Sequence, residues 1–159
     1  MNKKIAIVGQ FLPGELAQIV EALATALDEP RISAYETLQS FVADAHDHEF
    51  NAVITEHSFS LCVQDKPNDS DEYRQLVERV PTLHTESPLY SDEASLHLFE
   101  YLNRNRNPDL AVIYTRNIRS AQEDVESRSF RFTIRTIEKN TYSMDELIRT
   151  IREHVMQCT

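Results

Sequence analysis

From Asn51 to His57 the chain reads Asn-Ala-Val-Ile-Thr-Glu-His, a short apolar run that turns polar within one residue. A central strand of a parallel sheet is buried on both faces and therefore reads as a continuous apolar run. In such proteins, ligands and chemistry gather beyond the carboxyl ends of the strands. Glu56 stands at such an end. It is either a functional carboxylate or a solvated residue at a strand tip, and the sequence leaves both interpretations open.

Four further segments have the character of strands, and amphipathic segments with helical spacing separate them. The predicted strands are Lys4–Val8, Ile32–Tyr35, Ala52–Thr55, Leu110–Tyr114 with Thr115 at its end, and Phe130–Ile137. The predicted helices are Glu15–Leu27, Leu38–His46, a helix capped by Ser91 that ends at about Leu102, Ser120–Ser127, and a last helix capped by Ser143. This alternation predicts an α/β fold with a five-stranded parallel sheet and helices on both faces.

Residues 58–90 do not fit the alternation and are interpreted as an insertion within a single domain, 1–159. A polar loop from Lys66 to Asp71 is followed by a predicted short helix, Glu72–Val80. A connection of this length is usually functional or mobile. The helix carries an apolar stripe that either packs on the body as a flap or docks a partner protein. The stripe consists of Tyr73, Leu76, Val77 and Val80.

Composition excludes several classes of function. The 159 residues carry a formal net charge of −10, and an acidic surface disfavours nucleic-acid binding. No apolar run approaches the roughly 20 residues that cross a bilayer. Two cysteines are too few for a disulfide framework, so we expect a cytoplasmic protein without membrane partners. Gly9 and Gly14 are the only glycines, which excludes glycine-rich phosphate-binding loops.

The second half of the chain carries the clearest family resemblance. The segments Pro108–Thr115, Ile137–Lys139 and Asp145–Ile148, together with the five strand–helix units, resemble the receiver domain of bacterial response regulators. The resemblance covers nearly the whole chain apart from residues 58 to about 90. It implies a flavodoxin-like, receiver-like three-layer sandwich and a role in two-component signal transduction.

The chain departs from the family at the residues that carry phosphorylation. Glu56 aligns with the phosphate-accepting Asp of receivers, and Gly9 and Gln10 align with the acidic pair that holds Mg²⁺. Thr115 and Lys139 match the family's Thr/Ser and Lys. Mg²⁺ usually needs one or two carboxylates, and a carboxylate displaced by about 1 Å can lose on the order of 10²-fold in rate. The resemblance therefore indicates a non-enzymatic pseudo-receiver without metal or cofactor.

A pseudo-receiver would act through protein–protein contact, without phosphorylation. The predicted partner is a regulator, a kinase, an output domain or a second copy of the chain. The family's usual contact face implies residues 116–155, with Arg131, Arg135 and Arg149 as charged contacts. A Glu56–Lys139 pair that also holds Thr115 would replace the phosphate-controlled arrangement and lock one state.

Three alternatives remain at this stage. Glu56 could accept a phosphoryl group at an unusual metal site. The chain could instead be a flavodoxin-like small-molecule binder, although the scarcity of glycine disfavours close backbone approach to a phosphate. His57, Cys62 and His84 could join Glu56 around Zn²⁺, but their spacing matches no compact ligand pattern, and no metal site is predicted.

Overall fold

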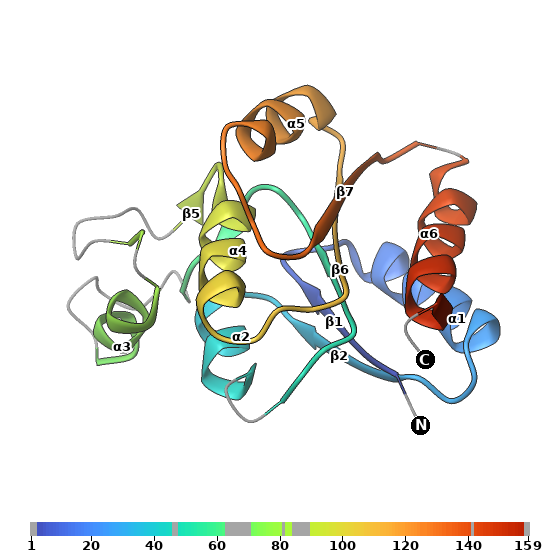
Figure 1. Ribbon diagram of the computed structural model, residues 1–159, viewed down its shortest axis with the longest axis horizontal. Coiled ribbons are helices and arrows are strands. Elements are labelled where there is room, and N and C mark those ends of the chain that lie inside the picture. Colours follow the sequence, from blue (N-terminus) through green and yellow to red (C-terminus); the bar gives the residue numbers. More distant parts are fainter. Residues whose placement is uncertain are drawn as a thin grey trace.

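The computed structural model describes residues 3–45, 48–62, 71–80, 82–83, 90–140 and 142–157, and five of its strands form one parallel sheet (Figure 1). The strands are β1 (Lys4–Val8), β2 (Arg31–Tyr35), β3 (Ala52–Thr55), β6 (Leu110–Thr115) and β7 (Thr133–Glu138). Their order is β2-β1-β3-β6-β7. This order is compatible with a flavodoxin-like fold, and it confirms the predicted α/β class with a five-stranded parallel sheet.

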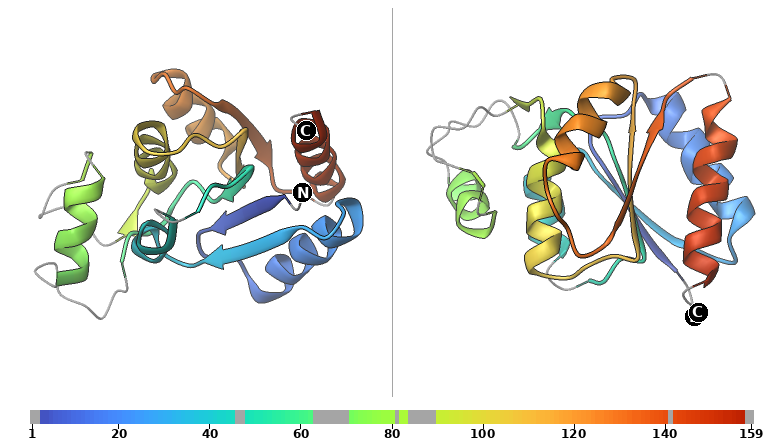
Figure 2. Two further views of the ribbon diagram at one scale, coloured as in Figure 1. Left: turned by 60° about the horizontal axis from the view of Figure 1, so that its bottom comes forward. Right: turned by 45° about the horizontal axis from the view of Figure 1, so that its top comes forward.

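The described part of the chain forms six helices, and helices lie on both sides of this sheet, with the helix of residues 71–79 standing outside them (Figure 2). They are α1 (Pro13–Ala26), α2 (Leu38–Ala45), α3 (Asp71–Arg79), α4 (Ala94–Arg104), α5 (Ile118–Glu126) and α6 (Ser143–Gln157). Alternate strand residues point to opposite faces, so β3 sends Val53 to one core and Ile54 to the other. The first core contains side chains of α2, α4 and α5, and the second contains side chains of α1 and α6.

The insertion is tied to the body by elements that the sequence did not predict. Two short strands, β4 (Phe59–Ser60) and β5 (Tyr90–Ser91), pair antiparallel as a separate two-stranded sheet. The predicted helix is present as α3, and Leu76 and Val80 join the first core. The apolar stripe is largely buried, because Tyr73, Leu76 and Val80 are 0%, 1% and 0% exposed. In this structure the stripe packs as a flap.

Several element starts differ from the predictions, and two of these differences have a clear physical reason. Ser91 does not cap α4, since it pairs with Phe59 in β5 and its hydroxyl accepts the N–H of Glu93. The last strand begins at Thr133 rather than Phe130. The alternating aromatic side chains of Phe130 and Phe132 pack edge-on against Phe99 of α4.

Some predicted features fall on parts of the chain that the structure does not describe. These are residues 66–70 of the predicted loop, His46, His84 and Cys158. No helix among the described residues has the length and apolar character needed to cross a membrane.

Candidate functional site

The carboxyl edge of the sheet collects the residues that the sequence singled out. Gly9 follows β1, Glu56 follows β3, Thr115 ends β6 and Lys139 follows β7. The parallel register pairs Val8 with Thr55, and Thr115 with Glu138, so these four positions lie along one edge. The backbone continues the pairing beyond the strands: the N–H of Glu56 donates to the carbonyl of Val8, and that of Lys139 donates to Thr115.

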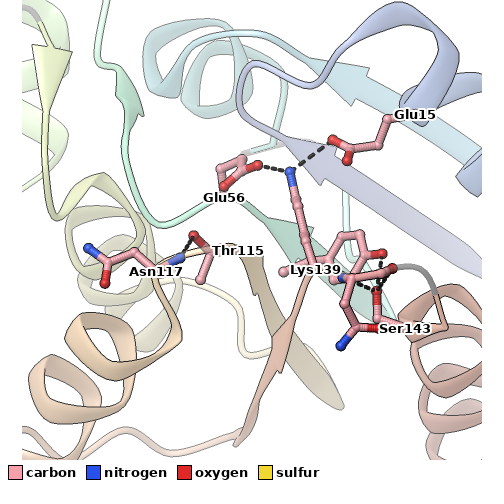
Figure 3. A network of polar contacts seen from close by, with 8 residues as sticks. Glu15, Glu56, Thr115, Asn117, Lys139 and Ser143 are labelled. Carbon is pink, nitrogen blue, oxygen red and sulfur yellow. Dashed lines mark hydrogen bonds and ion pairs between the residues drawn. The ribbon is translucent and has the colours of Figure 1, made fainter.

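An ammonium group between two carboxylates forms the centre of this edge. Lys139 Nζ donates to Glu56 Oε1 and also to Glu15 Oε1, the latter at 2.8 Å (Figure 3). The side chains of Lys139, Glu56 and Glu15 are only 9%, 15% and 20% exposed. We refer to these three residues as the lysine lock. It links the first turn of α1 to the ends of β3 and β7, three segments far apart in sequence.

Aromatic rings complete the surroundings of the ammonium group. Lys139 Nζ lies 4.6 Å from the ring centroid of Phe11 and 5.4 Å from that of Tyr114. Such rings attract a cation through their negative faces. Tyr114 is itself held, because its hydroxyl hydrogen-bonds that of Ser143 at 2.7 Å. The Lys139 side chain is therefore fixed by contacts on several sides as well as by charge.

Gly9 makes room for the carboxylate of the lock. Its φ of +126° is rarely adopted by residues with a side chain, and an added Cβ would lie 3.1 Å from the Cβ of Glu56. The N–H of Gly9 donates to the carbonyl of Tyr35, which fixes this turn against β2. The lack of a side chain at Gly9 thus admits the side chain of Glu56.

Two of the predicted pocket residues do not join the lock. The hydroxyl of Thr115 accepts the backbone N–H of Asn117 at 3.3 Å, so the expected hold of Glu56 on Thr115 is replaced by a local turn (Figure 3). Gln10 is exposed and its Oε1 accepts the hydroxyl of Ser60 in β4. Gln10 therefore connects the β1–α1 loop to the insertion.

The lock has a definite chemical consequence. Its formal charge is −1, because one ammonium group serves two carboxylates. An incoming phosphoryl group is an anion and would meet Glu15 and Glu56 with their cation already engaged. Removing one member of a mostly buried ion pair typically costs about 3–5 kcal/mol, since it leaves the partner charge without compensation. The arrangement therefore favours one fixed state of this edge.

A second polar group, absent from the sequence predictions, lies directly beside the lock. The ring of His57 is buried, with Nδ1 2.7 Å from the Ser95 hydroxyl and Nε2 2.9 Å from Asp124 Oδ2. A carboxylate only accepts, so Nε2 donates to Asp124, while Nδ1 and the Ser95 hydroxyl share the other hydrogen bond. The carbonyl of His57 also accepts the N–H of Ser95. His57 thus joins the end of β3 to α4 and α5.

Ser95, His57 and Asp124 contain the residue types of a hydrolytic triad, but their placement indicates a positioning role. Ser95 is 0% exposed, so no substrate can reach its hydroxyl. The separations along the chain, 38 and 67 residues, carry no motif that could have revealed the group. Glu15 was also missed; its only sequence signal is an acidic residue in the first turn of a helix after β1.

The remaining predicted residues are placed as follows. The proposed zinc ligands do not converge among the described residues: His57 faces Ser95 and Asp124, Cys62 is buried, and no group of three metal-ligating residues occurs there. Arg131 and Arg135 are exposed before and within β7. Arg149 lines a groove between α1 and α6, so the three arginines do not form one cluster.

Comparison of the chain with protein-family models, with curated proteins and with solved structures finds no match.

Proposed function

We propose that this chain is a regulatory domain that acts by binding another protein, built as a pseudo-receiver on a flavodoxin-like three-layer sandwich. It works without phosphorylation, in the cytoplasm of a bacterium. The observation that carries the proposal is the lysine lock, because Glu56 and Lys139, two of the residues expected to control a receiver, are engaged with each other.

The lock supports this function through the states that it permits. In a receiver, the lysine is available for the phosphoryl group that arrives at the neighbouring carboxylate. Here Lys139 already contacts Glu56 and Glu15 and is almost fully enclosed. A ligand can shift an equilibrium only by as much as its affinity differs between the states. Because Lys139 is already engaged, a phosphoryl group at this edge would bind no conformation much more tightly than another. The domain therefore stays in one conformation.

The direct test is exposure of the full chain to acetyl phosphate and Mg²⁺, followed by intact-mass measurement. We expect no added phosphoryl group on the chain, with an active receiver domain as the positive control in the same experiment. A stoichiometric gain of one phosphoryl group that is lost in Glu56→Gln would support the phosphoacceptor alternative and overturn the proposal.

A second test addresses the protein contact. The tagged full chain is used to capture partners from a lysate of its source, beside the variants Glu56→Gln and Glu138→Gln. Glu138 is exposed at the same edge and outside the lock, which makes it a matched charge control. We expect wild type and Glu138→Gln to capture the same amount of one partner protein, and Glu56→Gln to capture a different amount of it. Equal capture by all three proteins would contradict a role for the lock in partner binding.

A further inference from the structure

At the opposite, amino-terminal edge of the sheet, two hollows adjoin and share Phe50, Asn105 and Arg106. One has a volume of about 110 Å³ and the other, more open, about 490 Å³. Small-molecule sites typically occupy roughly 300–1,000 Å³ and combine apolar walls with a few placed polar groups. We call the two hollows together the amino-edge cleft. It lies at the other end of the strands from the lysine lock and does not depend on it.

The smaller hollow has the walls that suit a flat ring. Phe50 and Tyr101 supply aromatic surface, and Ala45, Leu102 and Pro108 supply aliphatic surface. The two aromatic residues are fixed by their neighbours, since Phe41 lies 5.7 Å from Phe50 and 6.3 Å from Tyr101 between ring centroids. Rings stacked or packed edge-on in this way present a preformed surface, and a ligand ring gains contact without much loss of side-chain freedom.

The larger hollow is lined by three cations and two carboxylates, an excess of positive charge on a chain whose formal net charge is −10. Lys3, Lys4 and Arg106 all contribute to it. Neither lysine has an ion-pair partner within the part of the chain that the structure describes. Arg106 is 4.0 Å from Glu49, but these side chains are 47% and 81% exposed, and pairs of this kind contribute little. The cations therefore remain available to an anion.

Hydrogen-bond donors fill the remaining wall. From Asn103 in the last turn of α4 to Asn107 in the loop before β6, asparagine and arginine alternate, and Asn105 and Asn107 line the larger hollow. One carboxylate there is partly engaged, because Asp109 Oδ2 accepts from Asn51 Nδ2 at 3.3 Å. The polar wall thus offers ammonium, guanidinium and amide donors beside the aromatic surface.

We propose that the amino-edge cleft binds a small molecule that joins an aromatic ring to an anionic group, of the class of a mononucleotide or an aromatic carboxylic acid. The ring lies against Phe50 and Tyr101, and the anion is held by Arg106 with Lys3 and Lys4. Side-chain cations, rather than a glycine-rich loop, bind the anion. The guanidinium of Arg106 borders both hollows, so it is placed to hold the anion where ring and anion join.

The test is a titration of the isotope-labelled full chain followed by nuclear magnetic resonance, with adenosine monophosphate and benzoate as probes. Adenosine supplies a ring without the anion, and inorganic phosphate supplies the anion without the ring. We expect saturable shifts of the backbone amides of Phe50, Asn105 and Arg106 with one or both anionic ring probes, and clearly weaker binding of the two controls. No saturable shift with either probe at millimolar concentration overturns the proposal, as does phosphate binding as tightly as both.

Two arginine substitutions sharpen the test. Arg106→Gln removes a charge from the cleft, whereas Arg116→Gln removes the same charge from an exposed site at the carboxyl edge. We expect Arg106→Gln to weaken binding about tenfold, the effect of one charge-assisted hydrogen bond, and Arg116→Gln to leave it unchanged. Equal weakening by both variants would show a general charge effect and overturn the site. Lys3→Gln supplies a second variant of the cleft.

Discussion

At the carboxyl edge of the sheet, one ammonium group lies between two carboxylates and under two aromatic rings. At the amino edge, three cationic side chains line a hollow and have aromatic neighbours, with Arg106 only loosely approached by Glu49. Both edges therefore combine lysine with aromatic side chains, but they differ in pairing and in exposure.

The difference separates a structural use of charge from a binding use. A cation enclosed with its counter-charges is not available to a further anion. Removing one member of the group strongly destabilises the fold, because it leaves a buried charge without compensation. A cation at a solvated rim interacts weakly with its neighbours and keeps its capacity for an incoming anion. The same residue types thus fix one edge of the molecule and leave the other open to ligands.

The largest expected effect comes from replacing the lysines at the two edges. Lys139→Met leaves Glu15 and Glu56 without their cation, and we expect the free energy of unfolding in urea to fall by about 3–5 kcal/mol. Lys3→Met at the amino edge removes a lysine without an ion-pair partner among the described residues, and a change within about 0.5 kcal/mol is expected. Similar losses in the two variants would contradict the contrast between the edges.

The two glycines provide a second, smaller contrast. Gly9→Ala places a Cβ at φ +126° and 3.1 Å from the Cβ of Glu56, so we expect a loss of about 1–3 kcal/mol in thermal or urea unfolding. Gly14→Ala, in the first turn of α1, has no atom within 4 Å of the added Cβ. Because alanine favours a helix over glycine, this variant should be neutral or stabilised by up to about 1 kcal/mol. A tolerated Gly9→Ala would show that the lock adjusts freely.

The sequence predicted the fold well where strands are buried on both faces. The limits of β1 and β3 agree with the predictions, since Lys4–Val8 and Ala52–Thr55 are bounded by abrupt changes in polarity. It predicted β7, an edge strand, but placed its start too early, because Phe130 and Phe132 alternate with polar residues as a strand would, yet pack on Phe99 of α4. Ser91 failed as a cap because tertiary pairing with Phe59 overrides a local preference.

Only part of the candidate site could be predicted from the sequence. Glu56 was predicted from its place at a strand end and Lys139 from the resemblance to receiver domains, and the structure brings these two side chains together. Glu15 depends on the path of the β1–α1 loop and on the direction of its side chain. Ser95 and Asp124 depend on how α4 and α5 pack on the body. Neither property leaves a local pattern, so the His57 group could be found only in three dimensions.

The His57 group gives a prediction of intermediate size that concerns α5. Asp124→Ala removes the partner of His57 Nε2, and we expect a loss of about 1 kcal/mol together with faster amide hydrogen exchange throughout α5. Asp124 is 35% exposed, so water can replace part of the lost bond. Glu123→Ala, the exposed neighbour on the same helix, is the control and should leave exchange in α5 unchanged. Equal exchange in both variants would mean that His57 does not hold α5.

The smallest expected effect is a pH dependence that involves one tyrosine near each edge. Burial, followed by the hydrogen bond to Asp44, raises the pKa of Tyr35 at the end of β2 from 10.0 to about 12. Burial also raises the pKa of Tyr101 in the amino-edge cleft from 10.0. The folded state therefore favours the neutral phenols. Their contribution to stability is complete below pH 10 and, for Tyr35, is lost as the pH rises toward about 12.

Urea unfolding at several pH values across this window, with absorbance titration of tyrosinate, measures the effect in wild type, Tyr35→Phe and Tyr101→Phe. Tyr35→Phe should show a shallower fall in stability than wild type, because it lacks the phenol whose pKa reaches about 12. An unchanged slope would indicate that Tyr35 ionises as freely in the folded as in the unfolded chain. Phe41 contacts both tyrosine rings, at 5.3 Å and 6.3 Å between centroids. Titration of Tyr35 in the Tyr101→Phe variant therefore tests whether a substitution in the amino-edge cleft changes the pKa of Tyr35, at the opposite edge, through these ring contacts.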